Sequence, residues 1–432
     1  WFLVDRIQEL SVVDLRWKNR VVGIEPHADH VTLHVDTPGG AYRLEANWVI
    51  DASGAHTLVR EQLGVGMTVS KAIDRWCISD VRFERPAPAE RWTWIEAHSN
   101  ENRAVWRHPM ADDVWRLDYQ MPPDADPNAV SAREVVEERI RRQFGDDVEF
   151  EIVWVGPYAY RSACADAFRI GRVFLAGDAA HVMSPFGARG GNSGIQDADN
   201  LVWKLALVLE NKAPEGLLDS YASERRFAAQ ENIRITNRTT RFLSPRSPTE
   251  RVLREAVIAL AREVPFARGF VNTGRLSSPT RYADSPLNVG AAGHSRAGRH
   301  VQNVALTLPD GTRGDLVELL LRYDHAVLVF FAFDVARDLA REVARIEEAF
   351  PARCLVLRAE ANETSRLPVV VDSEHKLAAQ LGVTLGEGAA AAIVRPDLHL
   401  AGTVEIKTAG DLEAALQVVL GGREPPRARR RR

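Results

Sequence analysis

The sequence predicts a mixed fold of the α/β class, with α+β character, divided into several domains. Two apolar runs, at residues 48–50 and 173–176, each lead into a turn that contains aspartate and glycine, which is typical of buried parallel strands. Residues 67–165 show short alternating strands, whereas the residues after 300 alternate strands with helices. Together these patterns favour a parallel-sheet domain, a second sheet domain and a small third α/β domain.

The composition is that of an ordinary globular protein, with 432 residues, a formal net charge of −4 and 45% hydrophobic residues. At about 150 residues per domain, this length suggests about three domains. The longest apolar run, residues 326–333, is far shorter than the ~20 residues of a membrane span, so no membrane segment is predicted. Three scattered cysteines form neither a disulfide framework nor a metal site, and we expect a cytoplasmic protein without a bound metal.

The C-terminal end is strongly basic, and residues 423–432 are predicted to form a disordered tail. Runs of like charge are usually solvated. No aromatic side chains interleave this run to stack on bases, so we expect no nucleic-acid partner.

The first part of the chain is predicted to contain strands followed by a short helix. Residues 31–36 alternate apolar and polar side chains, and residues 36–40 form a turn. The apolar run at 48–50 is predicted to be a strand that ends at Asp51, and a helix follows that stops at Gly64.

Residues 67–165 are predicted to form a sheet that covers a site. Trp115, Leu117 and Tyr119 alternate with polar residues, so one face of this strand is apolar. Ser131 and Glu134 have the spacing of a capping box, which predicts a helix that begins there and ends near residue 145.

The stretch from 171 to 201 carries the most chemical information. The second buried strand ends at Gly177 and Asp178, which places a carboxylate at the carboxyl edge of the sheet, where α/β folds bind ligands. The glycines of the loop that follows allow backbone to approach a planar ligand closely. The alternative is a tight structural corner with an incidental aspartate.

A long helix is predicted after this loop. Ser193 and Gln196 have capping-box spacing, which predicts that the helix begins at Ser193 and that its N-terminal N–H groups face the loop. Such a helix end stabilises negative charge on a ligand. The predicted apolar stripe comprises Ile195, Ala198, Leu201, Val202, Leu205, Val208 and Leu209.

Residues 171–201 resemble the second FAD-binding motif of the single-component aromatic hydroxylases, the family of p-hydroxybenzoate, phenol and 3-(3-hydroxyphenyl)propionate hydroxylases. Residues 197–204 and 218–225 also resemble the family pattern. The resemblance implies that Gly177 and Asp178 bind the ribityl chain of FAD. It also implies a loop along the isoalloxazine ring, formed by Pro185, Gly187, Gly190, Gly191 and Asn192.

Residues 51–60 resemble the middle motif of the same family, which contacts FAD and the route of the pyridine nucleotide. Gly54 and Arg60 match the family pattern, and both are expected to contribute to the cofactor site. Ser53 stands where the family has aspartate and Thr57 where it has serine, which leaves the pyridine-nucleotide role open. The alternative is a strand-to-helix turn with a surface arginine.

The family opens with a βαβ unit whose glycine-rich turn binds the FAD pyrophosphate, and this sequence contains no G-x-G-x-x-G motif. Because the sequence begins with Trp1, we expect a three-layer FAD-binding domain that is truncated at its N-terminus and lacks its first βαβ unit. These 432 residues alone are expected to bind FAD weakly.

The resemblance implies an FAD-dependent monooxygenase that hydroxylates a phenolic or related aromatic substrate with NADH or NADPH and O2. Two alternatives stay open: a flavin monooxygenase acting on an aromatic polyketide, and a non-catalytic binding or assembly module. The flavin supplies the chemistry, so only Pro185 and His181 are candidates for a direct role, and His181 also fits a structural position. The candidate substrate residues are Tyr119, Tyr158, Tyr160 and Arg161.

The residues after 300 resemble the thioredoxin-like extension of phenol hydroxylase and its relatives, through their strand and helix order and residues 394–397. Cys354 is the only cysteine there, so dithiol exchange is excluded and a structural or homodimer-contact role is expected. The predicted parts are 1–66 and 166–285 (FAD-binding), 67–165 (substrate sheet), 286–299 (linker), 300–422 (thioredoxin-like) and 423–432 (tail).

Overall fold

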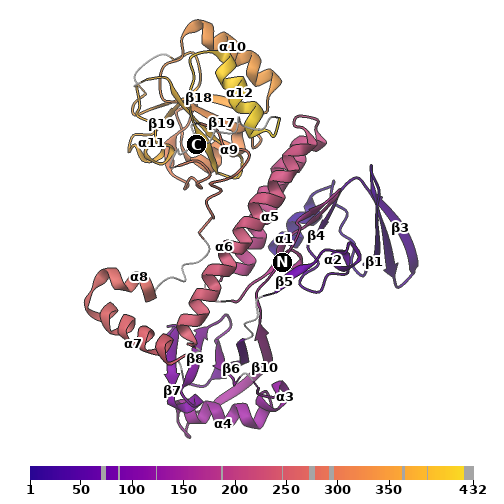
Figure 1. The fold of residues 1–432 in the computed structure, drawn as a ribbon, viewed down its shortest axis with the longest axis vertical. Coiled ribbons are helices and arrows are strands. Elements are labelled where there is room, and N and C mark those ends of the chain that lie inside the picture. Colours follow the sequence, from indigo (N-terminus) through magenta and orange to yellow (C-terminus); the bar gives the residue numbers. More distant parts are fainter. Residues whose placement is uncertain are drawn as a thin grey trace, which may run out of the picture.

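The protein has the mixed α/β fold that the sequence predicts. The computed structural model describes residues 1–69, 74–85, 88–122, 124–185, 188–245, 247–271, 278–290, 296–361, 365–386 and 388–422. Two long helices form the middle of the molecule, with an antiparallel sheet domain at one end and a C-terminal α/β domain at the other (Figure 1). No helix in these ranges is both long and apolar enough to cross a membrane.

A small sheet with the order β12–β13–β4 carries the candidate site. Strand β13 (Val173–Leu175) runs parallel to β4 (Val49–Asp51), and β12 (Arg169–Ile170) is antiparallel to β13. All three residues of β13 are buried, as its apolar run predicts. Beside this sheet lies an antiparallel hairpin sheet made of β1 (Arg20–Pro26), β2 (Val31–Thr37) and β3 (Gly40–Ala46), which shares its hydrophobic core.

The two long helices are α5 (Arg189–Leu209) and α6 (Asp219–Leu243), joined through the short 3-10 helix η3 (Glu215–Leu218). The prediction that the first of them begins at Ser193 with a Ser193–Gln196 capping box is wrong. The helix begins at Arg189 after Ala188, and the Ser193 hydroxyl lies inside it, accepting a hydrogen bond from Arg225 at 3.0 Å.

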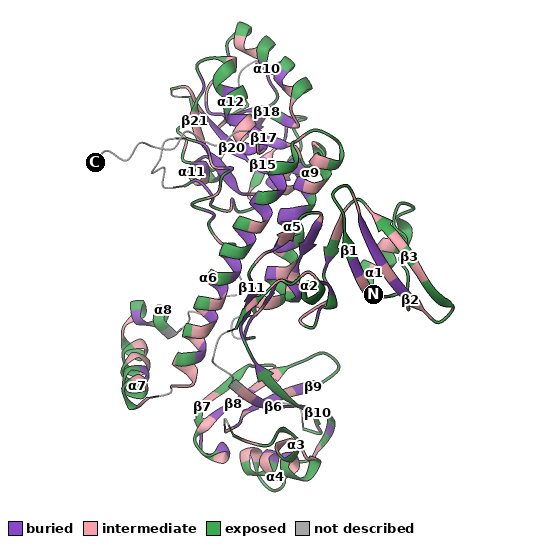
Figure 2. Cartoon of the chain, turned by 45° about the vertical axis from the view of Figure 1, so that its right-hand side comes forward, coloured by how far each residue is buried: buried purple, intermediate pink, exposed green. Residues whose placement is uncertain are grey.

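The buried face of α5 mixes polar and apolar side chains, so the predicted apolar stripe is correct only in part (Figure 2 shows the burial along the helix). Leu201 is buried, and Leu205 and Val208 pack against the same core. Ile195, Val202 and Leu209 are exposed. The side chains that α5 buries against α6 and the C-terminal domain include Ser193, Asp197, Asn200 and Lys204. Apolar periodicity alone therefore missed the polar part of the buried face.

The substrate-sheet region forms a five-stranded antiparallel sheet with the order β10–β6–β9–β8–β7. Helix α4 (Arg133–Phe144) covers one face, with Val136 and Ile140 fully buried, and Gly145 ends it as predicted. The predicted Ser131 cap is wrong: Ala132 precedes the helix without a side-chain cap, and Ser131 ends helix α3 (Pro127–Val130). The strands are β6 (Asp74–Phe83), β7 (Trp92–Ala97), β8 (Arg103–Pro109), β9 (Val114–Gln120) and β10 (Phe150–Tyr160).

Shorter elements connect these parts. The helices are α1 (Phe2–Glu9), α2 (Leu58–Gln62), α7 (Pro248–Glu263) and α8 (Arg268–Val271), with 3-10 turns η1 (His98–Asn100), η2 (Gly177–Ala179) and η4 (Pro265–Ala267). A small antiparallel sheet of order β14–β11–β5 contains His181–Val182, Ala163–Ala165 and Met67–Val69.

The C-terminal domain is a seven-stranded sheet of order β16–β15–β19–β18–β17–β20–β21, with a hydrophobic core on each face. Central strand β17 (Val327–Phe331) is parallel to β18 (Ala352–Arg358) and antiparallel to β20 (Ala390–Val394). The other elements are β15 (Ala305–Thr307), β16 (Arg313–Asp315), β19 (Val369–Val371), β21 (Leu400–Glu405), α9 (Leu316–Arg322), α10 (Arg337–Ala349), α11 (Lys376–Leu381) and α12 (Ala409–Val419).

The segment before this domain has the composition of a linker but packs against the domain. The Val289 N–H donates to Ala401 O at 2.9 Å, and the Gly298 N–H donates to Leu400 O at 2.8 Å. Residues 291–295 of the predicted linker and all of the predicted basic tail, 423–432, lie outside the described residues.

Candidate cofactor site

The two turns that the sequence singles out meet at one edge of the β12–β13–β4 sheet. Because β4 and β13 are parallel and Leu175 is in register with Asp51, both strands deliver their turns to the same carboxyl edge. The Ala176 N–H donates to Asp51 O at 2.9 Å and holds the turns together. This edge is where an α/β fold binds its ligand.

The first turn is organised around the buried Asp51 carboxylate. Its Oδ1 accepts from the Ser53 N–H at 3.0 Å and from the Ser53 hydroxyl at 2.5 Å, and its Oδ2 accepts from the Thr57 hydroxyl. The two residues that depart from the family pattern therefore stabilise the turn. Gly54 has φ +93°, and a Cβ added there would meet nothing within 4 Å, so the turn faces open space.

Arg60 lies inside the protein, which excludes the surface-arginine alternative. Its side chain is 7% exposed, and Nη1 donates to Ala179 O of the second turn at 3.2 Å. Arg60 therefore connects the two turns and stabilises the site from the interior of the protein.

In the second turn, Asp178 is exposed to solvent, whereas the residues beside it are held by contacts with the interior of the protein. Asp178 is exposed, whereas Ala179 and Ala180 are buried. Gly177 has φ +57°, which favours glycine, and its N–H donates to Asp197 Oδ2 at 2.9 Å. Helix α5 approaches so closely that a Cβ on Gly194 would lie 3.3 Å from the Gly177 Cα.

His181 is held in the interior behind this turn. It has no exposed surface, and its Nε2 lies 2.7 Å from Asp197 Oδ2. Burial alone raises the pKa of Asp197, but His181 and Arg225 outweigh that effect, so the pKa of this carboxyl lies below its ordinary value. The His181 ring is therefore tied to an ionised aspartate and does not face solvent.

The N-terminus of α5 completes the site. Because the helix begins at Arg189, its first N–H groups lack intrahelical partners and carry the positive end of the helix dipole. Gly190 and Gly191 lie in this first turn rather than in a loop, and a Cβ on Gly191 would meet nothing within 4 Å. The exposed Asn192 folds its side chain back, donating to Ala188 O at 2.7 Å.

Part of the predicted ring-facing loop is not described. Pro185 is exposed next to the helix start, but Gly187 lies outside the described residues, together with Phe186.

The predicted substrate residues do not share one surface. Tyr119 is fully buried with Cys77, Val136 and Ile140, under helix α4, and Arg139 lies over its ring, 5.3 Å from the centroid. Burial raises the pKa of Tyr119. Its placement as a substrate contact is therefore wrong, because the packing of α4 selects that face of the sheet as a core.

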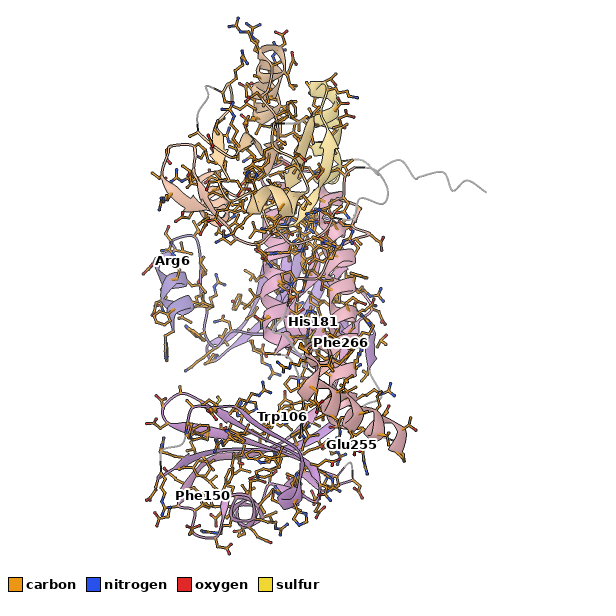
Figure 3. The ribbon with its side chains drawn as sticks, turned by 90° about the vertical axis from the view of Figure 1, so that its left-hand side faces the viewer. Arg6, Trp106, Phe150, His181, Glu255 and Phe266 are labelled. Carbon is orange, nitrogen blue, oxygen red and sulfur yellow. The ribbon has the colours of Figure 1, made fainter. Side chains whose placement is uncertain are left out.

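Tyr160 and Tyr158 lie on the opposite face, which carries an aromatic cluster. The Tyr160 ring centroid is 4.9 Å from that of Tyr158 and 6.1 Å from that of Trp76, which is 4.9 Å from that of Trp106. Figure 3 shows Trp106 on the side of the sheet toward the helices and Phe150 on the far side. Arg161, at the end of this strand, is exposed.

A cavity of about 400 Å³ lies between this face and the C-terminal half of α6. Thr240 lines it, and the Thr240 hydroxyl oxygen lies 3.5 Å from Ser184 Oγ, next to Pro185. Sequence reasoning missed this cavity, since its lining comes from several segments that lie far apart between residues 75 and 254. Its polar lining includes Arg75, Glu96, Arg103, Gln120, Arg251 and Arg254.

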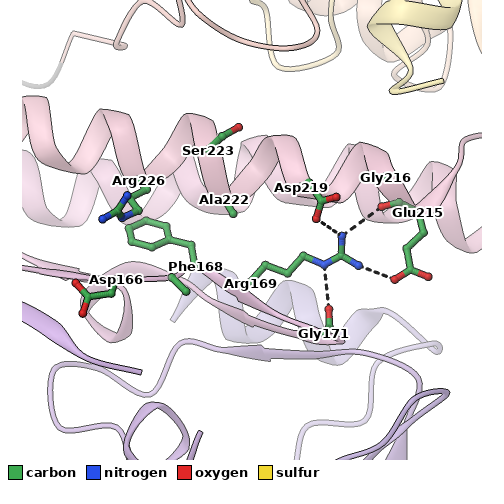
Figure 4. Close-up of a pocket in the computed structure, with 11 residues that line it drawn as sticks. Asp166, Phe168, Arg169, Gly171, Glu215, Gly216, Asp219, Ala222, Ser223 and Arg226 are labelled. Carbon is green, nitrogen blue, oxygen red and sulfur yellow. Dashed lines mark hydrogen bonds and ion pairs between the residues drawn. The ribbon is translucent and has the colours of Figure 1, made fainter. Parts of the chain in front are cut away.

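A second cavity, of about 670 Å³, lies along the start of α6 and away from the two turns (Figure 4). Its Arg169 is already satisfied, because it donates to Gly171 O at 2.9 Å and pairs with Glu215 and Asp219 at 2.6 and 2.7 Å. None of the predicted cofactor residues lines this cavity.

Comparison with known proteins identifies the family. A model of the FAD binding domain matches residues 2–236. The chain is 30% identical over 323 residues to 3-(3-hydroxy-phenyl)propionate/3-hydroxycinnamic acid hydroxylase 2 of Burkholderia vietnamiensis, covering 74% of this chain and 58% of the relative. It is 30% identical over 430 residues to 6-methylpretetramide 4-monooxygenase of Streptomyces rimosus, covering 96% and 74%.

The fold agrees with these sequence matches. The solved structure of anhydrotetracycline hydroxylase from Streptomyces rimosus superposes with a TM-score of 0.73 at 26% identity, covering 98% of this chain and 78% of that one. This chain spans 58% of the length of the Burkholderia relative, but 74% of the Streptomyces one. The chain therefore belongs to the family of FAD-dependent aromatic hydroxylases.

Proposed function

We propose that the protein is an FAD-dependent monooxygenase that hydroxylates a phenolic or related aromatic compound, with NADH or NADPH and O2 as co-substrates. The observation that carries the proposal is the convergence of an exposed Asp178, an open turn at Gly54 and the N-terminus of α5 on one sheet edge. The bound flavin would accept a hydride from the nicotinamide and activate O2, and the protein would supply binding, orientation and electrostatics.

The donors and acceptors at this edge fit FAD. The free carboxylate of Asp178 would accept hydrogen bonds from ribityl hydroxyls. The unpaired N–H groups at the start of α5, near Gly190 and Gly191, would stabilise the negative charge of the reduced isoalloxazine. His181, fully buried against Asp197, would position the turn rather than transfer a proton.

The substrate would enter between the flavin edge and the aromatic face of the sheet. The cavity there reaches Ser184 through Thr240 and is bordered by the cluster that contains Trp106 and Tyr160. Aromatic side chains offer apolar surface and edge-to-face contacts to a planar ring. Four arginines line the cavity against one glutamate, which favours a substrate with anionic character.

An aromatic polyketide is a second candidate substrate. Relatives that match nearly the whole chain include a 6-methylpretetramide monooxygenase and an anhydrotetracycline hydroxylase. Product analysis with a panel of simple phenols and aromatic polyketides would choose between the two substrate classes.

The decisive test of the proposed function is anaerobic titration of the purified protein with NADH and NADPH. Bleaching of bound flavin, accelerated by aromatic compounds, is the expected result. A folded protein expressed from the complete gene that contains no flavin would contradict the proposal and favour a non-catalytic binding module.

The domain assignment belongs to the same proposal. Residues 1–66 and 166–285 would form the FAD-binding domain, 67–165 the substrate sheet and 300–422 a thioredoxin-like domain. The order β18–β17–β20–β21 with flanking α10 and α12 supports the last of these. This domain would stabilise the fold or form a homodimer contact.

Replacing Tyr119 with phenylalanine tests which face of the sheet meets the substrate. The hydroxyl is buried and has no hydrogen-bond partner among the described residues, so its removal should leave KM and kcat unchanged and the melting temperature equal or slightly higher. Steady-state kinetics and thermal denaturation measure both. A several-fold rise in KM would show instead that Tyr119 contributes to the substrate site.

A further inference from the structure

A set of buried ionic side chains, made of two ion-paired groups that Tyr282 bridges, lies between the candidate cofactor site and the C-terminal domain. Each member is at most 3% exposed, and the set contains three acids and three bases. We call it the buried ion network; its members are Asp197, Lys204, Glu224, Arg225, Arg395 and Asp397.

One end of the network holds the turn at Gly177. Asp197 accepts from the Gly177 N–H at 2.9 Å through Oδ2 and from Arg225 Nε at 2.6 Å through Oδ1. Arg225 also donates to the Ser193 carbonyl and hydroxyl oxygens, at 3.1 and 3.0 Å. This arginine therefore fixes α5 and, through Asp197, the turn that carries Asp178.

The other end lies in the C-terminal domain. Arg395 donates to both oxygens of Glu224 on α6, at 2.5 and 2.9 Å, and also to Asp397. Asn200 of α5 donates to Glu224 at 2.8 Å and to Asp397 at 3.1 Å. The turn at residues 395–399 is thus bonded to both long helices.

Tyr282 connects the two ends. Its hydroxyl accepts from Arg225 Nη1 at 2.7 Å, and its ring stacks on His399 with centroids 4.4 Å apart. Tyr282 is 3% exposed, so this contact is shielded from water.

We propose that the 395–399 turn, acting through Tyr282 and Arg225, positions the Gly177–Asp178 turn for the cofactor, so that the C-terminal domain sets FAD affinity without touching FAD. Hydrogen bonds between buried charges are directional, whereas apolar contacts tolerate sliding of one surface over another. Arg395 and Tyr282 are thus positioning residues. The link to FAD rests on the proposed function, but the link to the Gly177 turn does not.

The experiment compares Tyr282→Phe with Tyr119→Phe, a matched substitution of another fully buried tyrosine. Tyr282→Phe removes the acceptor for Arg225 and keeps the ring on His399. Hydrogen exchange of the FAD-free protein, measured on peptides that cover residues 177–181, should be roughly tenfold faster in Tyr282→Phe and unchanged in Tyr119→Phe. Melting temperatures should stay within a few degrees of each other.

A second variant changes the end of the buried ion network that lies in the C-terminal domain. Arg395→Lys keeps the positive charge but loses the paired bonds to Glu224, and it should also accelerate exchange at 177–181. Both variants should weaken FAD binding about tenfold in fluorescence titrations. Exchange at 177–181 equal to that of Tyr119→Phe in both variants would overturn the proposal.

The exchange rates at residues 177–181 and the FAD affinities distinguish a failure of this proposal from a failure of the proposed function. A folded wild-type protein, expressed from the complete gene, that binds no FAD contradicts the proposed function, while the exchange rates, measured without FAD, still decide whether the network positions the turn. A protein that binds FAD equally well in all variants overturns the control of affinity by the C-terminal domain.

Discussion

Replacing Glu224 with alanine should lower the free energy of unfolding by about 3–5 kcal/mol. The Glu224 carboxylate is 3% exposed and accepts hydrogen bonds from Lys204 and Arg395, both of which have no exposed surface. Its removal leaves the buried Lys204 without its anion and Arg395 with Asp397 alone, and such charges cannot be solvated in place. Urea denaturation followed by circular dichroism measures the loss.

The same helix provides the control. Glu231, also on α6, pairs with Arg234 at 2.9 Å in an exposed position. Because solvent already screens that pair, Glu231→Ala should change the stability far less than Glu224→Ala. Equal losses in the two variants would mean that the buried pairs contribute no more than a surface contact.

The pH dependence of this effect has a definite sign. Burial raises the pKa of Glu224, but Arg395 and Lys204 outweigh it and hold this pKa well below the ordinary 4.5. A carboxyl whose pKa falls on folding stabilises the native state above its unfolded pKa and loses that contribution as the pH falls. The stability difference between wild type and Glu224→Gln should therefore be constant above about pH 5.5 and shrink below about pH 4.5.

Replacing Asp178 with alanine should weaken FAD binding by roughly tenfold to a hundredfold, with little change in stability. Asp178 is exposed at the end of the strand pair, so its carboxylate supports the fold little and is available to ribityl hydroxyls. One or two hydrogen bonds to a charged acceptor account for a loss of this size. Quenching of FAD fluorescence, with protein expressed from the complete gene, gives the dissociation constants.

Asp219→Ala is the matched control for this variant. Asp219 is also an exposed aspartate, but it begins α6 and pairs with Arg169 at 2.7 Å, away from the two turns. Its removal should leave FAD affinity unchanged. If Asp178→Ala bound FAD as tightly as Asp219→Ala, the ribityl assignment would be wrong.

The strands and the sheet edge that carries the candidate site were predictable because their signals are local. An apolar run such as 173–175 must be buried, and a following Gly177–Asp178 must turn at the sheet edge. The register of Leu175 with Asp51 then follows from parallel pairing. These features depend on neighbours in the sequence, so composition and spacing identify them.

The errors arose where distant partners decide the outcome. Polar side chains of α5 are buried because Arg225, Glu224 and Asp397 neutralise and bond them, and the sequence of the helix itself does not reveal partners so far along the chain. Apolar periodicity therefore favoured the exposed Ile195. Likewise, alternation in β9 defines two faces, but only the packing of α4 reveals that Tyr119 belongs to the core.

The buried ion network also limits how freely the parts of this protein can be exchanged between relatives. Its six charges come from α5, α6 and the 395–399 turn, and Glu224 of α6 pairs both with Lys204 of α5 and with Arg395 of the turn. A chimera that takes its C-terminal domain from a relative must also inherit compatible residues at 200, 204, 224 and 225 in the long helices. In a recombination experiment, an exchangeable unit must therefore keep both partners of each charge pair together. The glycine- and proline-rich segment between the domains is not a sufficient boundary for such a unit.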